Sequence, residues 1–348
     1  MELPPVASCA MRAIAVDAMG GDLAPDEVVK GVAAASLQTN IQCVLVGDER
    51  RIQEALERTE YNPENIDILA AGEVIGMAEE PKEAVRHKRD ASILVAAQLV
   101  ADGRADALVS AGNTGAAVLA CARHFKVIPG IRKTALASVY PRQTEYPGQD
   151  HLALLLDVGA TIRCDALELV QFAVMGSAYA KRVSKVASPR VALLNMGTEP
   201  SKGSPELIEA HRTLAAMPGL NFIGNIEGND LVRGKADVIV CEGLVGNVAL
   251  KLLEGLAEVM VDMAGAAVEE SWRWRLGMRM LAGGVERLRE LADYTTYGGA
   301  PILGFENIFI KAHGRSPARA IANAVKVAAK AVRDGVAEEI ATGLAGGR

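Results

Sequence analysis

The chain has 348 residues, half of them apolar, with a formal net charge of -6. A chain of this length can bury a large core in one or two α/β domains. Its acidic balance excludes nonspecific nucleic-acid binding, and no apolar run approaches the roughly 20 residues of a membrane-spanning helix. The five cysteines are scattered without C-x-x-C spacing. This argues against a zinc site or a disulfide framework and is typical of a reduced, cytoplasmic compartment.

Short apolar runs alternate with helix-like segments along most of the chain, after a lead-in (residues 1–11) that we expect to be disordered. Strands are predicted over 41–46, 66–69, 106–110, 134–140, 152–156, 191–195, 221–226, 238–241 and 308–312. Helices are predicted over 48–58, 81–103, 165–182, 204–217 and 316–332. The alternation predicts a doubly wound, mostly parallel sheet in an α/β/α sandwich. We expect one catalytic domain over 12–333 and a flexible C-terminal tail over 334–348.

Five apolar runs end in a glycine-containing polar turn, which is the most informative pattern of the sequence. The turns follow Asp17, Ser110, Asp157, Asn195 and Cys241. In parallel sheets the ligand sits outside the carboxyl ends of the strands, so these turns predict one crevice. Glycine lets backbone N–H groups approach a ligand, and a helix N-terminus favours an anion. The pattern therefore predicts an α/β enzyme that binds a phosphate.

The candidate binding residues lie on these turns or just after them. They are Asp17, Gly20, Gly21, Ser110, Gly112, Asn113, Thr114, Gly115, Asp157, Asn195, Gly197, Thr198, Glu199, Glu242, Gly246 and Lys251. Some have a structural alternative: 110–115 as an ordinary strand-to-helix turn and Lys251 as a surface lysine. Asp22, which follows Gly21, is better interpreted as a cap of the next helix. No dinucleotide fingerprint or metal-ligand spacing is present, so we expect neither a cofactor nor a metal.

Four further side chains are candidates for the chemistry itself. Lys202 on the 195–203 turn suits phosphate as a point charge, and Lys311, His313 and Asn247 follow strand ends or begin helices. The alternatives are a solvated lysine at 202 and a histidine at 313 that only holds its own turn. Cys241 is either a nucleophile or, the better interpretation, a small core residue.

Residues 248–291 break the alternation and predict a protruding helical hairpin. Its tip is basic and aromatic, with Trp272, Arg273, Trp274, Arg275 and Met278. Wound as a helix, this segment has two apolar sides, and both cannot face the parent domain. One side is expected in a homodimer interface, and the other against a membrane surface or an acidic carrier protein.

Ten ordered blocks of the sequence resemble the bacterial phosphate acyltransferase family from about Met11 to Arg333. They include DAMGGD at 17–22, SAGNTGA at 110–116, DVGA at 157–160, LNMGTE at 194–199 and KAHG at 311–314. Departures occur at Thr161, Glu242 and 305–307. The resemblance implies a Rossmann-like fold similar to phosphotransacetylase and isopropylmalate dehydrogenase.

The resemblance also implies a reaction: an acyl-[acyl-carrier-protein] thioester and inorganic phosphate give acyl phosphate and free carrier protein, for phospholipid synthesis. It implies a homodimer, peripheral membrane association and a downstream glycerol-3-phosphate acyltransferase. We assign 110–115 and Lys202 to phosphate, Asn195 and Asn247 to positioning, and His313 or Lys311 to the oxyanion. The alternatives are a phosphotransacylase that uses acyl coenzyme A and a noncatalytic membrane-surface scaffold. A nicotinamide dehydrogenase is a more distant alternative.

Overall fold

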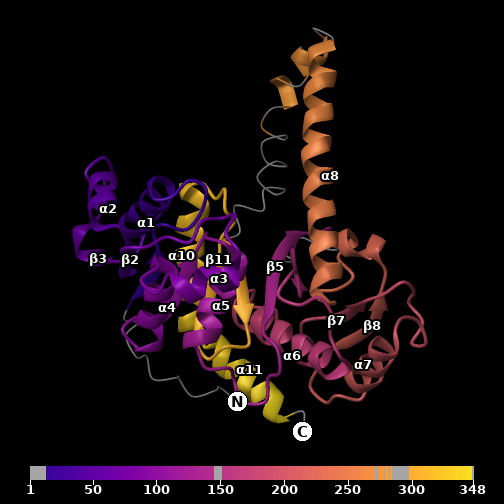
Figure 1. Ribbon diagram of the computed structural model, residues 1–348. Helices are drawn as coiled ribbons and strands as arrows, with labels where there is room; N and C mark the ends of the chain where they lie inside the picture. The colour runs from indigo at the N-terminus through magenta and orange to yellow at the C-terminus, as the bar shows by residue number, and fades with distance from the viewer. Residues whose placement is uncertain are drawn as a thin grey trace. The chain divides into compact units, whose positions relative to one another are not determined.

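A computed structural model of the protein describes residues 13–144, 151–270, 273–277, 279–281, 283 and 298–346. These residues form two compact units. Unit 1 takes its described residues from 1–134, 178–187 and 297–348, and unit 2 from 135–177 and 188–296. Figure 1 shows the helices and strands of each unit, most of them labelled.

Unit 1 is built on six strands in the order β3-β2-β1-β4-β11-β10. The bounds are β1 (Ile14–Asp17), β2 (Cys43–Gly47), β3 (Ile66–Ala70), β4 (Ala107–Ser110), β10 (Ala300–Leu303) and β11 (Ile308–Lys311). All neighbours are parallel except β10 and β11. The strands β1, β4 and β11 are buried throughout, which explains why they read as apolar runs without alternation.

The helices of unit 1 cover this sheet. They are α1 (Asp26–Gln38), α2 (Glu49–Leu56), the 3-10 turn η1 (Pro63–Asn65), α3 (Pro81–His87), α4 (Ser92–Ala101), α5 (Thr114–His124), α10 (Ala318–Arg333) and α11 (Val336–Gly346). The chain passes from β1 to β2 to β3 and then returns beyond β1 to β4. Right-handed crossovers therefore put α1 and α2 on one face and α3 and α4 on the other.

Unit 2 has five strands in the order β5-β6-β9-β7-β8, of which only β5 runs antiparallel to its neighbour. The bounds are β5 (Ala135–Pro141), β6 (Leu152–Leu156), β7 (Val191–Leu194), β8 (Phe222–Ile226) and β9 (Val238–Val240). Its helices are α6 (Ala166–Arg182), whose last residues belong to unit 1, α7 (Pro205–Ala215), the 3-10 turn η2 (Gly228–Arg233) and α8 (Gly243–Glu270).

The predicted α/β class with a mostly parallel sheet is confirmed, and most predicted elements lie within a few residues of the observed ones. Three segments differ. Strand β10 was not predicted, and the predicted helix over 81–103 is two helices, α3 and α4. Where we expected a flexible tail over 334–348, the structure has α11, because Val336 and Ile340 are buried and Arg182 pairs with Glu339 at 2.6 Å.

Helix α8 is the long orange helix of unit 2 in Figure 1 and begins the predicted hairpin. Its 28 residues give a length of about 42 Å. Residues 273–277 are helical too, with Arg273, Trp274 and Arg275 exposed. Trp272, Met278 and most of the predicted return arm lie outside the described residues. In the described part of the chain, no helix combines the length and apolarity needed to cross a bilayer.

Candidate functional site

Three polar residues end three adjacent parallel strands of unit 1. Asp17 ends β1, Ser110 ends β4 and Lys311 ends β11, and the strand register pairs Ser110 with both of the others. All three are buried. Each of them was a candidate from the sequence, and unit 1 brings them together at the carboxyl edge of its sheet, where an α/β sheet binds its ligand.

The Asp17 carboxylate is held by two serine hydroxyls. Ser92 donates to Oδ1 at 2.6 Å and Ser110 donates to Oδ2 at 2.7 Å. Burial raises the pKa of Asp17, while these hydrogen bonds and the charge of Lys311 oppose that rise. A buried carboxylate beside a buried cation is costly unless both are well paired. Such an arrangement is more typical of a functional site than of a packing core.

Lys311 is the second buried charge of this cluster. Burial lowers its pKa to about 8, against the attraction of Asp17 and Asp22. Its ammonium donates to the carbonyl of Ala312. The β strand fixes the backbone of Lys311, since Ala312 N donates to Ser110 O at 2.9 Å. Near neutral pH this group is a cation held close to the end of β4, where it suits an anion or a developing oxyanion.

The turn after β4 leads directly into α5. Gly112 N donates to the Ser110 hydroxyl at 3.0 Å, and Asn113 caps the helix through its Oδ1, which accepts from Ala116 N at 3.1 Å. The amides of Thr114 and Gly115 stand at the first two helical positions, where no intrahelical carbonyl can accept from them. These two amides and the helix dipole favour an anion at this terminus.

The side chain of Asn113 is already engaged with the backbone. Besides capping α5, its amide nitrogen donates to Met77 O and Glu79 O, both at 3.1 Å. It ties the 77–79 loop to the turn. The part of the turn that is available to a ligand is therefore its backbone N–H groups.

Gly20 lies against the same turn. A side chain at position 20 would collide with Asp17 Oδ2 and would lie 2.8 Å from Gly112 N. Gly21 has a φ of 114°, which only glycine adopts easily, and the next amide, of Asp22, donates to Gly314 O at 2.8 Å. Both glycines are thus required for the turns after β1 and β4 to approach each other.

His313 follows Lys311 by two residues and is exposed. Its Nδ1 accepts from Arg315 N at 3.3 Å, a local contact that holds the turn before α10. This contact agrees with the structural alternative for His313, in which the histidine holds its own turn.

In unit 2, Asp157 lies one residue after β6 and is fully buried. Its Oδ1 accepts from the amides of Leu136, Gly159 and Ala160 at 2.9 to 3.1 Å, and Oδ2 accepts from Thr161 N at 2.7 Å. Four backbone donors occupy this carboxylate. The Asp157 carboxylate therefore stabilises the turn that follows β6.

The start of α8 packs onto the Asp157 turn. The Thr161 hydroxyl accepts from Gly243 N at 3.1 Å, and a side chain at Gly246 would collide with Asp157 O. Cys241 is buried and its thiol contacts Asp157 O at 3.5 Å. Burial raises the pKa of this thiol well above 9.0, so it is protonated near neutral pH and poorly suited to act as a nucleophile.

The remaining α8 candidates lie nearer the surface. Asn247 is exposed, with its Oδ1 facing Gly159, and Glu242 is half-buried. Lys251 is exposed and pairs with Glu254 at 2.6 Å. This pairing agrees with the interpretation of Lys251 as a surface lysine.

The 195–203 turn of unit 2 is braced by two asparagines. Asn195 donates to Lys202 O at 2.8 Å and accepts from Met196 N at 2.8 Å, and Asn225 donates to Glu199 O at 2.9 Å. Gly197 is buried in this turn, whereas Thr198, Glu199 and Lys202 are exposed. The ammonium of Lys202 therefore projects from a turn whose backbone is fixed.

Neither Ser92 nor the bracing role of Asn225 was predicted from the sequence. Ser92 was placed inside one long helix over 81–103, but the chain leaves the helix at Lys88 and starts α4 at Ser92. Asp90 fixes this break, because its carboxylate accepts from Gly72 N at 2.6 Å. The Asp-Ala-Ser sequence at 90–92 resembles a helix start and was the available signal.

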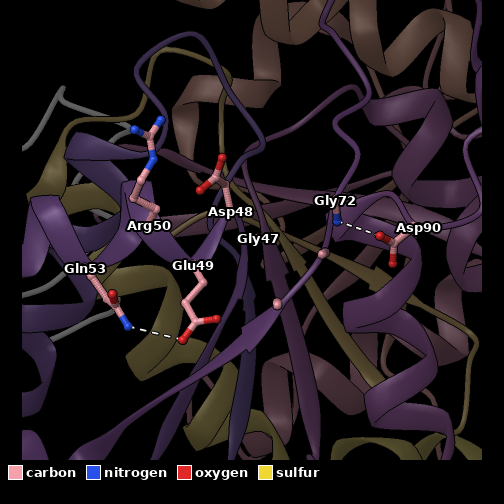
Figure 2. A pocket seen from close by; sticks show the side chains of 9 residues that line it. Gly47, Asp48, Glu49, Arg50, Gln53, Gly72 and Asp90 are labelled. Carbon is pink, nitrogen blue, oxygen red and sulfur yellow. Dashed lines mark hydrogen bonds between the residues drawn. The ribbon is translucent and has the colours of Figure 1, made fainter.

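An open pocket of about 550 Å³ lies at the carboxyl ends of β2 and β3 (Figure 2). Its acidic side chains are engaged in local contacts: Asp48 caps α2 through Arg51 N, Glu49 accepts from Gln53, and Asp90 accepts from Gly72 N. Among the residues described in either unit, no three His, Cys, Asp or Glu side chains form a possible metal site.

The chain matches the family model "Fatty acid synthesis protein" over residues 12–339. A phosphate acyltransferase of Dictyoglomus turgidum is 43% identical over 332 residues, covering 95% of this chain and 97% of the relative. A phosphate acyltransferase of Moorella thermoacetica is 46% identical over 327 residues, with 93% of each chain covered.

Solved structures with the same fold are more distant in sequence. A phosphotransacetylase from Streptococcus pyogenes aligns with a TM-score of 0.64 and 18% identity over 94% of each chain. A 4-hydroxythreonine-4-phosphate dehydrogenase from Klebsiella pneumoniae aligns with a TM-score of 0.51 and 16% identity, over 92% of this chain and 99% of the other. These likenesses support the fold, while the match over nearly the whole length shows that the chain belongs to the fatty acid synthesis protein family, with phosphate acyltransferases among its relatives.

Proposed function

We propose that this phosphate acyltransferase transfers the acyl group of an acyl-[acyl-carrier-protein] thioester to inorganic phosphate, giving acyl phosphate and free carrier protein. Family membership supports the reaction type. The observation that carries the proposal is the row formed by Asp17, Ser110 and Lys311 at the carboxyl edge of unit 1, next to the free amides that begin α5. This arrangement offers an anion both N–H donors and a cation.

In the proposed reaction a phosphate oxygen attacks the thioester carbonyl carbon. The tetrahedral intermediate collapses with cleavage of the C–S bond, and the thiolate of the carrier leaves and takes up a proton. Phosphate is itself the nucleophile, so no acyl-enzyme is needed, in agreement with the buried thiol of Cys241. A thiol leaving group with a pKa near 8.5 requires little acid assistance.

Each group of the unit 1 cluster has a proposed task. The amides of Thr114 and Gly115 bind phosphate, and the Lys311 ammonium stabilises the negative charge of phosphate or of the developing oxyanion. Asp17 keeps Lys311 protonated and aligns the Ser110 hydroxyl. For unit 2, phosphate binding by Lys202 and positioning by Asn195 and Asn247 remain predictions.

Hydroxylamine trapping tests the proposal directly. Protein, acyl-carrier protein and phosphate are mixed, and the acyl hydroxamate that forms from acyl phosphate is measured. Formation that requires phosphate and proceeds with the carrier thioester is expected. Turnover only with acyl coenzyme A would favour a phosphotransacylase, and no product from either donor would favour a noncatalytic scaffold.

In this proposal, α8 packs against a second copy of the chain and forms a homodimer. An apolar stripe at three- and four-residue spacing follows this helix, with each side chain more than half exposed on the single chain: Leu244, Val248, Leu252, Leu256, Val259 and Met263. Burying such a stripe against a second copy would remove it from water. Sedimentation of wild type beside a Leu252→Glu, Leu256→Glu variant tests this, and a wild-type monomer would contradict it.

The second part of the proposal for this region is peripheral attachment to a membrane. A glycerol-3-phosphate acyltransferase would then use the acyl phosphate that the protein makes. Trp274 is 52% exposed, and Arg273 and Arg275 are exposed beside it. Trp with Arg suits the headgroup region of a bilayer. Loss of binding to anionic vesicles in a Trp274→Ala variant is expected, and absence of wild-type binding at low salt would reject attachment.

A further inference from the structure

We infer that a basic pocket of unit 1, separate from the Asp17 cluster, docks an acidic helical face of the carrier protein that brings the acyl thioester. The inference rests on the proposed function. The pocket has a volume of about 330 Å³, and its lining includes Arg89, Arg104 and Arg123. Asp102 is the single carboxylate among the lining residues.

The floor of this pocket is aliphatic. Leu94, Val95 and Leu99 of α4 line it together with Leu69 of β3. Leu94 and Leu99 are buried, whereas Leu69 and Val95 are only half-buried and can contact a partner. An aliphatic floor with a charged rim is the composition of a protein interface, in which apolar contacts give affinity and charges give orientation.

The charge of the pocket is positive and is not neutralised locally. Asp102 accepts from Gln98 at 2.6 Å, and no carboxylate in the described residues pairs with Arg89, Arg104 or Arg123. Other arginines of unit 1 do have such partners, for example Arg58 with Asp26 and Arg182 with Glu339. Within the described part of unit 1, Arg123 donates only to a backbone carbonyl, that of Val85. A cluster of exposed arginines without carboxylate partners is unusual on a chain whose net charge is -6.

His124 adds no positive charge to the pocket near neutral pH. Burial lowers its pKa below 6.5, and the neighbouring guanidinium of Arg123 lowers it further. The imidazole is therefore neutral at pH 7, and the attraction for an anion comes from the three arginines.

The spacing of the arginines favours an extended acidic partner over a single phosphate group. Arg89 precedes α4 and Arg104 follows it, and ten helical residues separate the two ends by about 15 Å. All three side chains are exposed, whereas a dedicated phosphate site usually concentrates buried donors at one point. A row of carboxylates along a helix matches such a span.

Helix α4 connects this pocket to the candidate site. Its first residue, Ser92, donates to Asp17, and its next turns line the pocket through Leu94, Val95 and Leu99. A carrier protein that docks along α4 would therefore lie within about 15 Å, one length of this helix, of the strand ends to which its thioester must be delivered. Delivery of the thioester to these strand ends therefore requires docking on unit 1 alone.

The test compares two acyl donors that differ only in the protein part: acyl-carrier protein and the same acyl group on free pantetheine. An Arg89→Glu, Arg104→Glu variant is expected to raise the KM for acyl-carrier protein at least about tenfold, with kcat and the pantetheine reaction nearly unchanged. The wild-type KM should also rise with salt, and the variant should lose most of that dependence.

Arg50→Glu is the matched control, because Arg50 is an exposed arginine of unit 1 that lines the other pocket. It makes a charge reversal of the same kind away from α4 and should leave both KM values near wild type. An unchanged KM for acyl-carrier protein in the double variant, or an equal loss with both donors, would overturn the inference. So would a rise in KM that is seen only with acyl coenzyme A, which would indicate a small-anion site.

Direct binding separates this inference from the proposed function. Fluorescence anisotropy of labelled carrier protein measures docking whether or not acyl phosphate forms. Weaker binding to the double variant, with wild-type binding by Arg50→Glu, supports the docking surface even if neither donor reacts. Equal binding to wild type and the double variant rejects it.

Discussion

Asp17 and Asp157 are two buried aspartates at strand ends, one in each unit, and their surroundings differ in kind. Asp157 accepts from four backbone amides, so its carboxylate is saturated by the turn that it organises. Asp17 accepts short hydrogen bonds from the hydroxyls of Ser92 and Ser110, has one longer backbone contact from Met19 N at 3.4 Å, and lies near the buried Lys311. Backbone donors are part of the fold, whereas side-chain donors and a cation can respond to a ligand. We therefore expect changes at Asp157 to affect mainly stability and changes in the Asp17 cluster to affect mainly activity.

Asp157→Ala should give the largest effect on stability. It leaves four amide donors without their acceptor, among them the buried Leu136 N, and we expect a loss of about 3 kcal/mol or more in the free energy of unfolding. Urea denaturation followed by circular dichroism measures this. A variant of unchanged stability that has lost phosphate binding would show that Asp157 is instead a ligand residue.

Lys311→Met should give the largest effect on activity. Removing the cation is expected to lower kcat/KM by about 100- to 1000-fold, comparable to loss of one oxyanion donor. Lys326→Met, a change of the same kind on α10, should keep wild-type rates, since the Lys326 ammonium donates to Gln38 at the end of α1. Full activity of Lys311→Met would remove this lysine from the proposed mechanism.

The pH dependence of kcat/KM in the wild type tests the role of Lys311. Because its pKa is about 8, the group is a cation below that pH and neutral above it. If the cation is the active form, kcat/KM falls as pH rises through about 8. Lys311→Arg keeps the charge, so its residual activity should lack that fall. A rate that instead rises through pH 8 would indicate that the neutral amine acts as a base.

Ser92→Ala should give a smaller effect on activity. Asp17 loses one hydroxyl donor, so its pKa rises further and a smaller fraction of it is ionised at low pH. We expect kcat to fall about tenfold and its acidic limb to move to higher pH. Ser36→Ala is the control, since this buried hydroxyl donates to Ala33 O at 2.7 Å within α1. A lower kcat with an unmoved acidic limb would mean that Ser92 acts only through packing.

Asn113→Ala should give the smallest effect. Loss of the α5 cap is expected to cost about 1 kcal/mol of stability, and Asn113→Ser, which can still cap but cannot donate to Met77 O and Glu79 O, should restore part of it. Thermal unfolding of both variants measures the difference. If stability holds while the KM for phosphate rises tenfold, the side chain faces the ligand as the sequence suggested.

The sequence by itself determined the α/β class and the position of most strands, because fully buried parallel strands are short apolar runs bounded by turn residues. It also placed Asp17, Ser110 and Lys311 at strand ends, since their polarity interrupts those runs. The motifs around them carried the family resemblance. Strand β10 was missed because Gly298, Gly299 and Pro301 resemble a turn, yet antiparallel pairing with β11 makes a strand of this segment.

Only the tertiary structure decided which partners each polar side chain has. Asp17 and Asp157 look alike in sequence, each ending an apolar run before a glycine-containing turn. The difference between them depends on Ser92, which lies 75 residues from Asp17, and on the break between α3 and α4 that brings it there. Likewise, Arg89, Arg104 and Arg123 are scattered along the chain and form one pocket only when α4 and α5 pack together. Local periodicity reports burial, but it carries no information about contacts between residues that are distant in the chain.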